Sequence, residues 1–139
     1  DASSDMGLYQ FDLRSGRAEK VPGTEGLHYP LWSPDGRRLA AVHFDTAHIF
    51  LFDIKTGKRT DIAGPASWPV WSNDSQYLYY NTIGTGVFRV HVPDGKPEMV
   101  LQAPFRLTSG AFALTPDGSV VMLREHGHYD VYALHLSPP

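Results

Sequence analysis

A short turn motif that recurs at nearly constant spacing is the feature that most constrains the fold of this chain. Residues 32–36 read Trp-Ser-Pro-Asp-Gly, and altered copies follow at 71–75 (Trp-Ser-Asn-Asp-Ser) and 114–118 (Leu-Thr-Pro-Asp-Gly). The copies begin 39 and 43 residues apart, and this period is typical of the four-stranded blades of a β-propeller. The repeat therefore predicts an all-β fold built from antiparallel, four-stranded blades.

The residue types inside the motif fit a tight turn between two strands. Pro34 presets φ at the first central position, Asp35 accepts hydrogen bonds from nearby amides, and Gly36 tolerates positive φ. The second copy has Asn73 and Ser75 where the other copies have proline and glycine. Its turn is therefore the weakest match to the pattern.

Short apolar or alternating runs flank each motif and are separated by Gly, Pro, Asn and Asp, which indicates strands joined by turns. Sustained helical spacing is nearly absent. We predict one partial propeller domain over residues 1–139, with repeats at 27–63, 67–101 and 107–136 and an N-terminal hairpin at 8–21 from a preceding blade. The fourth strand of the first full repeat, 59–62, is short and charged, as an exposed edge strand tends to be.

The number of predicted strands is too small for a closed ring. Propellers close with about four to eight blades, whereas about three blades are present here. Open flanks would expose apolar surface and unpaired backbone groups. We therefore expect the chain to be part of a longer propeller chain or one member of a homo-oligomer, for example two copies arranged head to tail.

Composition narrows the classes of partner. Hydrophobic residues make up 42% of the chain and charged residues 19%, which is an ordinary globular balance. The formal net charge is -3, with twelve scattered basic residues, so direct nucleic acid binding is not expected. No apolar run is long enough to span a bilayer. The absence of cysteine excludes disulfides and thiolate metal sites, and it fits a cytoplasmic and a bacterial periplasmic protein equally well.

The motif at 32–36, the apolar run at 39–42 (Leu-Ala-Ala-Val) and the strand end at 52–54 (Phe-Asp-Ile) together carry a family resemblance. With these features the sequence resembles the TolB-like family of bacterial β-propeller repeats, and it is similar to the propeller domains of dipeptidyl peptidases and prolyl oligopeptidases. The TolB-like resemblance implies a periplasmic or other extracytoplasmic scaffold. Similar repeats form the sensory ends of bacterial winged-helix regulators, and the peptidase resemblance implies a gating propeller.

Signatures of catalysis are missing from the sequence. There is no Gly-x-Ser-x-Gly nucleophile motif and no cysteine, and the Gly-x-Gly pair at 84–86 is better explained as a hairpin turn than as a phosphate-binding loop. We therefore predict a non-catalytic binding or scaffold module that docks a protein or small ligand through its loops. The sensory propeller and the gating propeller of a serine peptidase remain the alternatives.

The candidate ligand-binding residues are mostly histidines in loops. In the usual blade order, the loops joining second to third strands and fourth to first strands gather at one mouth of the central channel. Imidazoles and carboxylates there could bind an anion or hold a divalent metal ion, although solvated loop residues are the plainer interpretation and no cofactor is predicted. The candidates are His28, His43, Asp45, His48, Glu125, His126 and His128.

Tryptophans and one arginine are the candidates for contacts with other surfaces. Trp32 and Trp71 occupy the same motif position and are predicted to pack between blades. Trp68 lies at the loop end of its strand, where core packing is the favoured interpretation and an exposed anchor for a partner is the alternative. Arg106, in a loop, is the second candidate partner contact. Repeated positions favour structural roles for His91 and His135.

Overall fold

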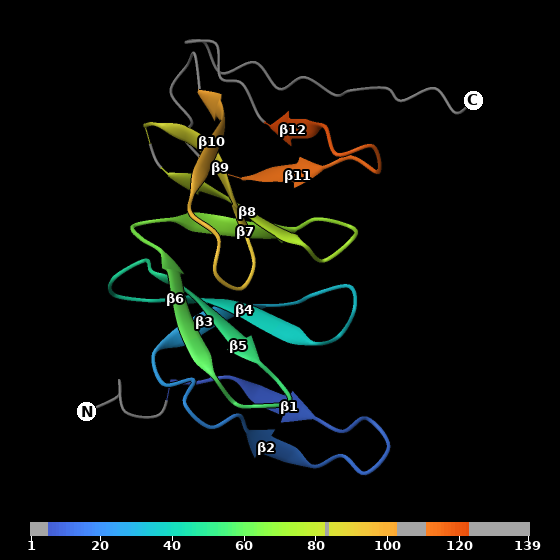
Figure 1. The fold of residues 1–139 in the computed structure, drawn as a ribbon. Helices are drawn as coiled ribbons and strands as arrows, with labels where there is room; N and C mark the ends of the chain where they lie inside the picture. Colours follow the sequence, from blue (N-terminus) through green and yellow to red (C-terminus); the bar gives the residue numbers. More distant parts are fainter. Residues whose placement is uncertain (1–5, 83, 103–110, 123–139) are drawn as a thin grey trace, which may run out of the picture.

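The structure is a computed structural model that describes residues 6–82, 84–102 and 111–122. Every regular element in these residues is a β-strand. Two sheets have four strands in the simple order of the chain, and two smaller sheets have two strands each. Figure 1 shows the four sheets following one another in sequence order. The predicted all-β fold of four-stranded antiparallel blades is thus confirmed.

The described strands form two four-stranded sheets and two hairpins. The first full blade contains β3 (Leu27–Trp32), β4 (Arg38–His43), β5 (Ile49–Asp53) and β6 (Arg59–Ala63). The second contains β7 (Ser67–Trp71), β8 (Tyr77–Thr82), β9 (Gly86–His91) and β10 (Glu98–Gln102). The N-terminal hairpin contains β1 (Tyr9–Phe11) and β2 (Ala18–Lys20), and the last described hairpin contains β11 (Phe112–Leu114) and β12 (Val120–Met122).

The hydrophobic core lies between successive sheets, and β4 shows why. Its residues Leu39 and Ala41 pack with the N-terminal hairpin, whereas Ala40 and Val42 pack toward the second full blade. Alternate side chains of a strand point to opposite faces of its sheet. A strand covered on both faces therefore needs a continuous apolar run, and this is the Leu-Ala-Ala-Val segment seen in the sequence.

Each repeated turn is held by the same set of side-chain hydrogen bonds. Ser33 Oγ donates to Asp35 Oδ1 at 2.6 Å, and Arg38 N donates to Ser33 Oγ at 2.9 Å. Ser72 and Asp74 make the equivalent bond, also at 2.6 Å. These bonds stabilise the charged carboxylate, so the pKa of Asp35 and that of Asp74 lie below the ordinary value, mainly because of the serine hydroxyl.

The two departures from the motif in the second copy both make contacts between blades. Ser75 has φ 61° and is 1% exposed, and its Oγ accepts a hydrogen bond from Asp35 N at 3.1 Å. Asn73 Nδ2 donates to Pro116 O at 3.3 Å. The turn that matches the motif least well therefore connects the turns of the blades on either side of it.

The motif tryptophans differ in burial although they share a repeat position. Trp71 is 8% exposed, and its Nε1 donates to Leu31 O of the preceding blade at 3.0 Å. Trp32 is 52% exposed. The prediction of packing between blades is confirmed for Trp71 and wrong for Trp32, because within the described residues the sheet before β3 has only two strands.

The first strand of each blade lies at the same edge of its sheet. β3 and β11 both lie beside β7, and in a propeller ring this edge lines the central channel. The third predicted repeat extends beyond the described residues, so its remaining strands stay a prediction. In the parts of the chain that the structure describes, there is no helix that could cross a membrane.

Candidate binding site at the loop face

The loops predicted to gather at one mouth of the channel do come together. Ala66 N, between β6 and β7, donates to Ala47 O, between β4 and β5, at 2.8 Å. Phe44 N donates to Gly26 O, before β3, at 2.9 Å. In Figure 1 these loops lie on the opposite side of the sheets from the Asp-containing turns. We call this side the loop face.

Two aromatic side chains meet at the loop face. Tyr29 and Trp68 lie 39 residues apart, at the same repeat position, and the ladder of each strand shifts register there. Both have positive φ, 53° and 52° respectively. Their ring centroids are 5.4 Å apart, and their exposed fractions are 55% and 40%. Trp68 is therefore an exposed residue, and its interpretation as a core residue is wrong.

Positive φ is costly for bulky side chains, and such strain is concentrated at ligand-binding and active sites. Phe44, also exposed, extends the aromatic surface through His28, whose ring is 4.8 Å from Tyr29 and 5.5 Å from Phe44. We call Tyr29, Phe44 and Trp68 the aromatic ledge. Tyr29 and Phe44 were not among the residues predicted from the sequence to bind a ligand or partner. The available signal was an aromatic-Pro pair at 29–30 and again at 68–69.

His28 and His43 form a pair of partly buried imidazoles beside the ledge. The Nδ1 atom of each is buried and has no hydrogen-bond partner. Burial lowers the pKa of His28, and repulsion by His43 lowers it further. His28 is therefore neutral near pH 7 and suits a neutral hydrogen-bonding ligand better than an anion. Gly26, at φ +72°, lets the chain pass His43, since a Cβ there would lie 2.9 Å from Nε2.

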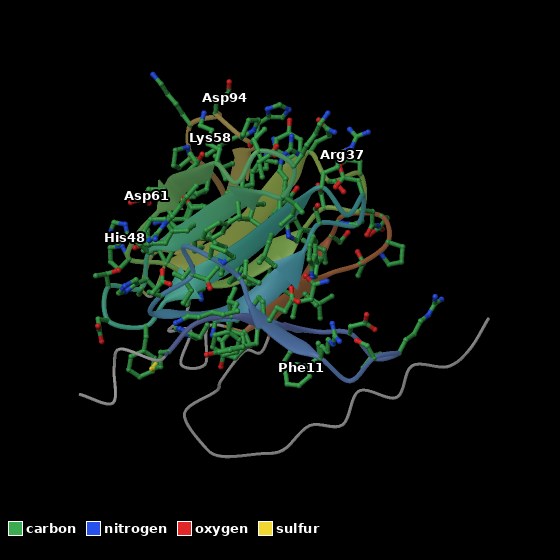
Figure 2. All side chains as sticks on the ribbon, turned by 90° about the horizontal axis from the view of Figure 1, so that it is seen from below. Phe11, Arg37, His48, Lys58, Asp61 and Asp94 are labelled. Carbon is green, nitrogen blue, oxygen red and sulfur yellow. The ribbon has the colours of Figure 1, made fainter. Side chains whose placement is uncertain are left out.

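His48 makes a separate, structural contact. Its Nδ1 lies 2.9 Å from Asp61 Oδ2, and its ring stacks on Phe50 at 6.3 Å between centroids. Figure 2 shows His48 and Asp61 together, with Arg37 at the opposite end of the sheet. Asp45 lies in the exposed turn between His43 and His48.

The structure does not gather the described candidates into a metal site. Within residues 6–82, 84–102 and 111–122, no three His, Asp or Glu side chains are placed to hold a metal ion. The other four candidates lie outside the described residues and stay predictions. They are Arg106, Glu125, His126 and His128.

A small apolar pocket opens at the same face between the two full blades. Its volume is about 170 Å³, and Ala47, Pro65, Ala66, Ser67 and Thr82 line it. The Oγ atom of Ser67 is buried without a hydrogen-bond partner. This volume is well below that of pockets for drug-sized ligands. The pocket therefore suits one small apolar side chain.

No family model matches the chain, but comparison with known proteins finds relatives by sequence. The chain is 27% identical to a dipeptidyl-peptidase 5 from Porphyromonas gingivalis (strain ATCC 33277), and the match covers 72% of this chain and 17% of that protein. The chain therefore corresponds to a small part of this relative.

Solved structures share the fold at low sequence identity. The tricorn protease matches with a TM-score of 0.60 and 19% identity, over 78% of this chain and 12% of the protease. An oligogalacturonate lyase from Vibrio parahaemolyticus matches with a TM-score of 0.57 and 11% identity, over 83% of this chain and 37% of the lyase. A putative 6-phosphogluconolactonase from Bacteroides uniformis matches with a TM-score of 0.54 and 16% identity, over 79% of this chain and 38% of that protein.

These matches and the stacked four-stranded sheets define the chain as a β-propeller segment. It spans less than two fifths of each of these proteins. The similar proteins carry the names of enzymes. The TolB-like assignment stays a prediction.

Proposed function

We propose that this chain is part of a larger propeller whose loop face binds an extended polypeptide, without catalysing a reaction itself. The observation that carries the proposal is the exposed pair Tyr29 and Trp68, whose rings meet at an interplanar angle of 49° and whose backbones are held at positive φ in equivalent strands. Exposed aromatic side chains supply much of the free energy at protein interfaces. An unstrained chain would avoid this backbone conformation at two bulky residues, and a binding role accounts for both features.

The groups around the ledge suit a peptide. Neutral His28 lies beside the ledge, 4.8 Å from the Tyr29 ring, so the uncharged backbone of a peptide suits this surface better than an anion does. The pocket of about 170 Å³ can hold one small apolar side chain of the peptide.

The likeness to dipeptidyl-peptidase 5 favours a second, narrower candidate, which is the propeller of a serine peptidase. In that case the loop face would select or gate peptide substrates for a catalytic domain elsewhere in the protein. Sequencing the gene on both sides of these residues tests this candidate. A serine hydrolase domain in the same reading frame is the expected result, and a complete gene without one would leave the scaffold role alone.

Peptide binding can be measured by fluorescence anisotropy with labelled, unstructured decapeptides that differ only in a central Ala, Val, Pro, Phe or Lys. Trp68→Ala and Tyr29→Ala should each weaken binding by about tenfold or more, as expected for loss of about 1.4 kcal/mol or more at an anchor. Leu13→Ala is the matched control, because Leu13 is an exposed apolar residue in the turn after β1.

The pocket predicts that central Val or Pro binds better than central Phe or Lys. The peptide-binding role would be refuted if Trp68→Ala and Tyr29→Ala bound the peptides as tightly as the control Leu13→Ala. It would also be refuted if the native chain bound none of them.

A further inference from the structure

The charges around the aromatic ledge are negative. Among the described loops of the loop face, the charged side chains are Glu25 and Asp45, and none is lysine or arginine; these loops are residues 23–26, 44–48, 64–66 and 84–85. Glu25 has Lys20 at 4.0 Å, whereas Asp45 makes no ion pair within the described residues. Asp45 is exposed and directly follows Phe44 of the ledge. The ledge therefore lies beside an unpaired carboxylate.

Basic residues gather on the opposite side of the sheets. Figure 2 shows Arg37 at the end of the sheet away from His48. Charges of one sign on a surface favour ligands of the other sign. A basic ligand thus suits the loop face better than it suits the side with the Asp-containing turns. The basic residues in the turns on that side include Arg14, Arg37, Lys55, Lys58 and Lys96.

The chain itself places arginines on aromatic rings elsewhere. The guanidinium carbon of Arg59 lies 3.7 Å from the centroid of the Phe50 ring, and that of Arg89 lies 4.9 Å from the centroid of the Tyr77 ring. The face of an aromatic ring is the negative end of its quadrupole, so it attracts a cation. Within the described residues, no lysine or arginine lies over a ring of the aromatic ledge in this way.

The rings of the ledge are available to such a cation. Tyr29, Trp68 and Phe44 are 55%, 40% and 63% exposed. His28, whose ring is 4.8 Å from that of Tyr29, has a pKa lowered by burial, so near pH 7 it adds no positive charge that would repel a cation. The ledge thus combines exposed ring faces, a neutral imidazole and a nearby carboxylate.

We propose that the aromatic ledge binds an arginine side chain of the peptide, with the guanidinium over the rings of Tyr29 and Trp68 and attracted by Asp45. The inference rests on the proposed peptide site and names its substrate class, which is basic extended peptides. Arginine is favoured over lysine because its planar, weakly hydrated guanidinium stacks on aromatic faces.

The small apolar pocket at the same face fixes where this arginine lies in the peptide. Ser67 of the pocket wall directly precedes Trp68 of the ledge. In an extended chain, side chains on the same side are two residues apart, or about 6.6 Å. The peptide therefore carries a small apolar residue in the pocket and an arginine two residues before or after it.

The test uses labelled decapeptides with a central Val and one variable residue two positions before or after it, titrated into the native chain and followed by fluorescence anisotropy. The variable residue is Arg, citrulline, Glu, Phe or Pro. Citrulline has nearly the shape of arginine without its charge. At the better of the two positions, the Arg peptide should bind about fivefold more tightly than the citrulline peptide. The Glu peptide should bind more weakly than both.

Variants of the chain locate the effect. Asp45→Asn should lower the ratio of Arg to citrulline affinity by about twofold, as expected for an exposed charge pair. Asp94→Asn is the matched control, because Asp94 is an exposed carboxylate in the turn after β9, on the opposite side from the loop face; it should leave the ratio unchanged. Trp68→Leu should lower the ratio to about two or less, because leucine keeps an apolar contact but has no ring face.

Equal affinities for the Arg and citrulline peptides, with the loss of binding in Trp68→Ala retained, would overturn this inference and leave the peptide site standing. Tighter binding of the Phe or Pro peptide than of the Arg peptide would also overturn it, because the ledge would then select stacking without charge. A ratio that Trp68→Leu leaves unchanged would place the arginine elsewhere and have the same consequence. A native chain that binds none of the peptides would overturn both proposals.

Discussion

Ser75 offers a sharp test of how a repeated turn is stabilised when its glycine is replaced. At φ 61° a non-glycine residue costs about 1 kcal/mol relative to glycine. The buried Ser75 Oγ, which accepts from Asp35 N at 3.1 Å, contributes about 1 kcal/mol in return. The two effects have similar size and opposite sign. Substitutions that remove one or both should therefore be distinguishable.

Ser75→Ala keeps the backbone strain and loses the hydrogen bond, so it should lower the free energy of unfolding by about 1 kcal/mol. Ser75→Gly loses both and should lie within about 0.5 kcal/mol of the native chain, because strain relief offsets the lost bond. Gly36 is the matched control at the equivalent position, since it has φ +70° and a Cβ there meets nothing within 4 Å. Gly36→Ala should therefore report the backbone cost alone, about 1 kcal/mol.

Urea unfolding followed by far-UV circular dichroism gives these free energies if the slope m is unchanged among the variants. A Ser75→Gly variant as unstable as Ser75→Ala would show that backbone strain is not the opposing effect. A neutral Ser75→Ala variant would show that the bond between blades contributes nothing to stability. Either result would refute the reasoning.

Two further predictions concern the motif. Trp71→Phe should destabilise the chain by about 2 kcal/mol more than Trp32→Phe in the same urea assay, because only Trp71 is buried with its indole bonded to Leu31; equal effects would contradict its role between blades. The pKa of Asp35 and that of Asp74 are lowered from 3.8, so their stabilising contribution is present above that pH and lost as pH falls through the lower folded-state values. Melting temperature measured from pH 6 to pH 2.5 should fall in the acid range, and less steeply in Asp74→Asn; parallel curves would exclude this contribution from Asp74.

Much of the fold could be predicted because its signals are local. The Ser-x-Asp pattern at 33–35 closes a turn with its own side chains, so it needs no distant residue to be recognised. The run at 39–42 indicates a strand covered on both faces, and the structure buries those residues on two sides. The repeat then fixes the order of strands in each blade.

The candidate site was only partly predictable, because neighbours in sequence separate in space. His43 and His48 begin and end one turn, yet His43 lies with His28 whereas His48 bonds to Asp61. The contact between Tyr29 and Trp68 depends on how two blades stack and on a register shift in each ladder. Residue type and spacing in the sequence reveal neither the stacking of the blades nor the register shifts.

The sequence alone determined that this chain forms β-propeller blades, because period, turn chemistry and alternation are properties of short segments. Only the tertiary structure decided which of two identical residues at equivalent positions is buried. Trp71 is buried and its indole bonds to Leu31 of the four-stranded sheet before it, whereas Trp32 is exposed beside the two-stranded sheet of β1 and β2. Burial depends on what packs against a side chain, and a repeated motif does not indicate which neighbouring strands pack against it.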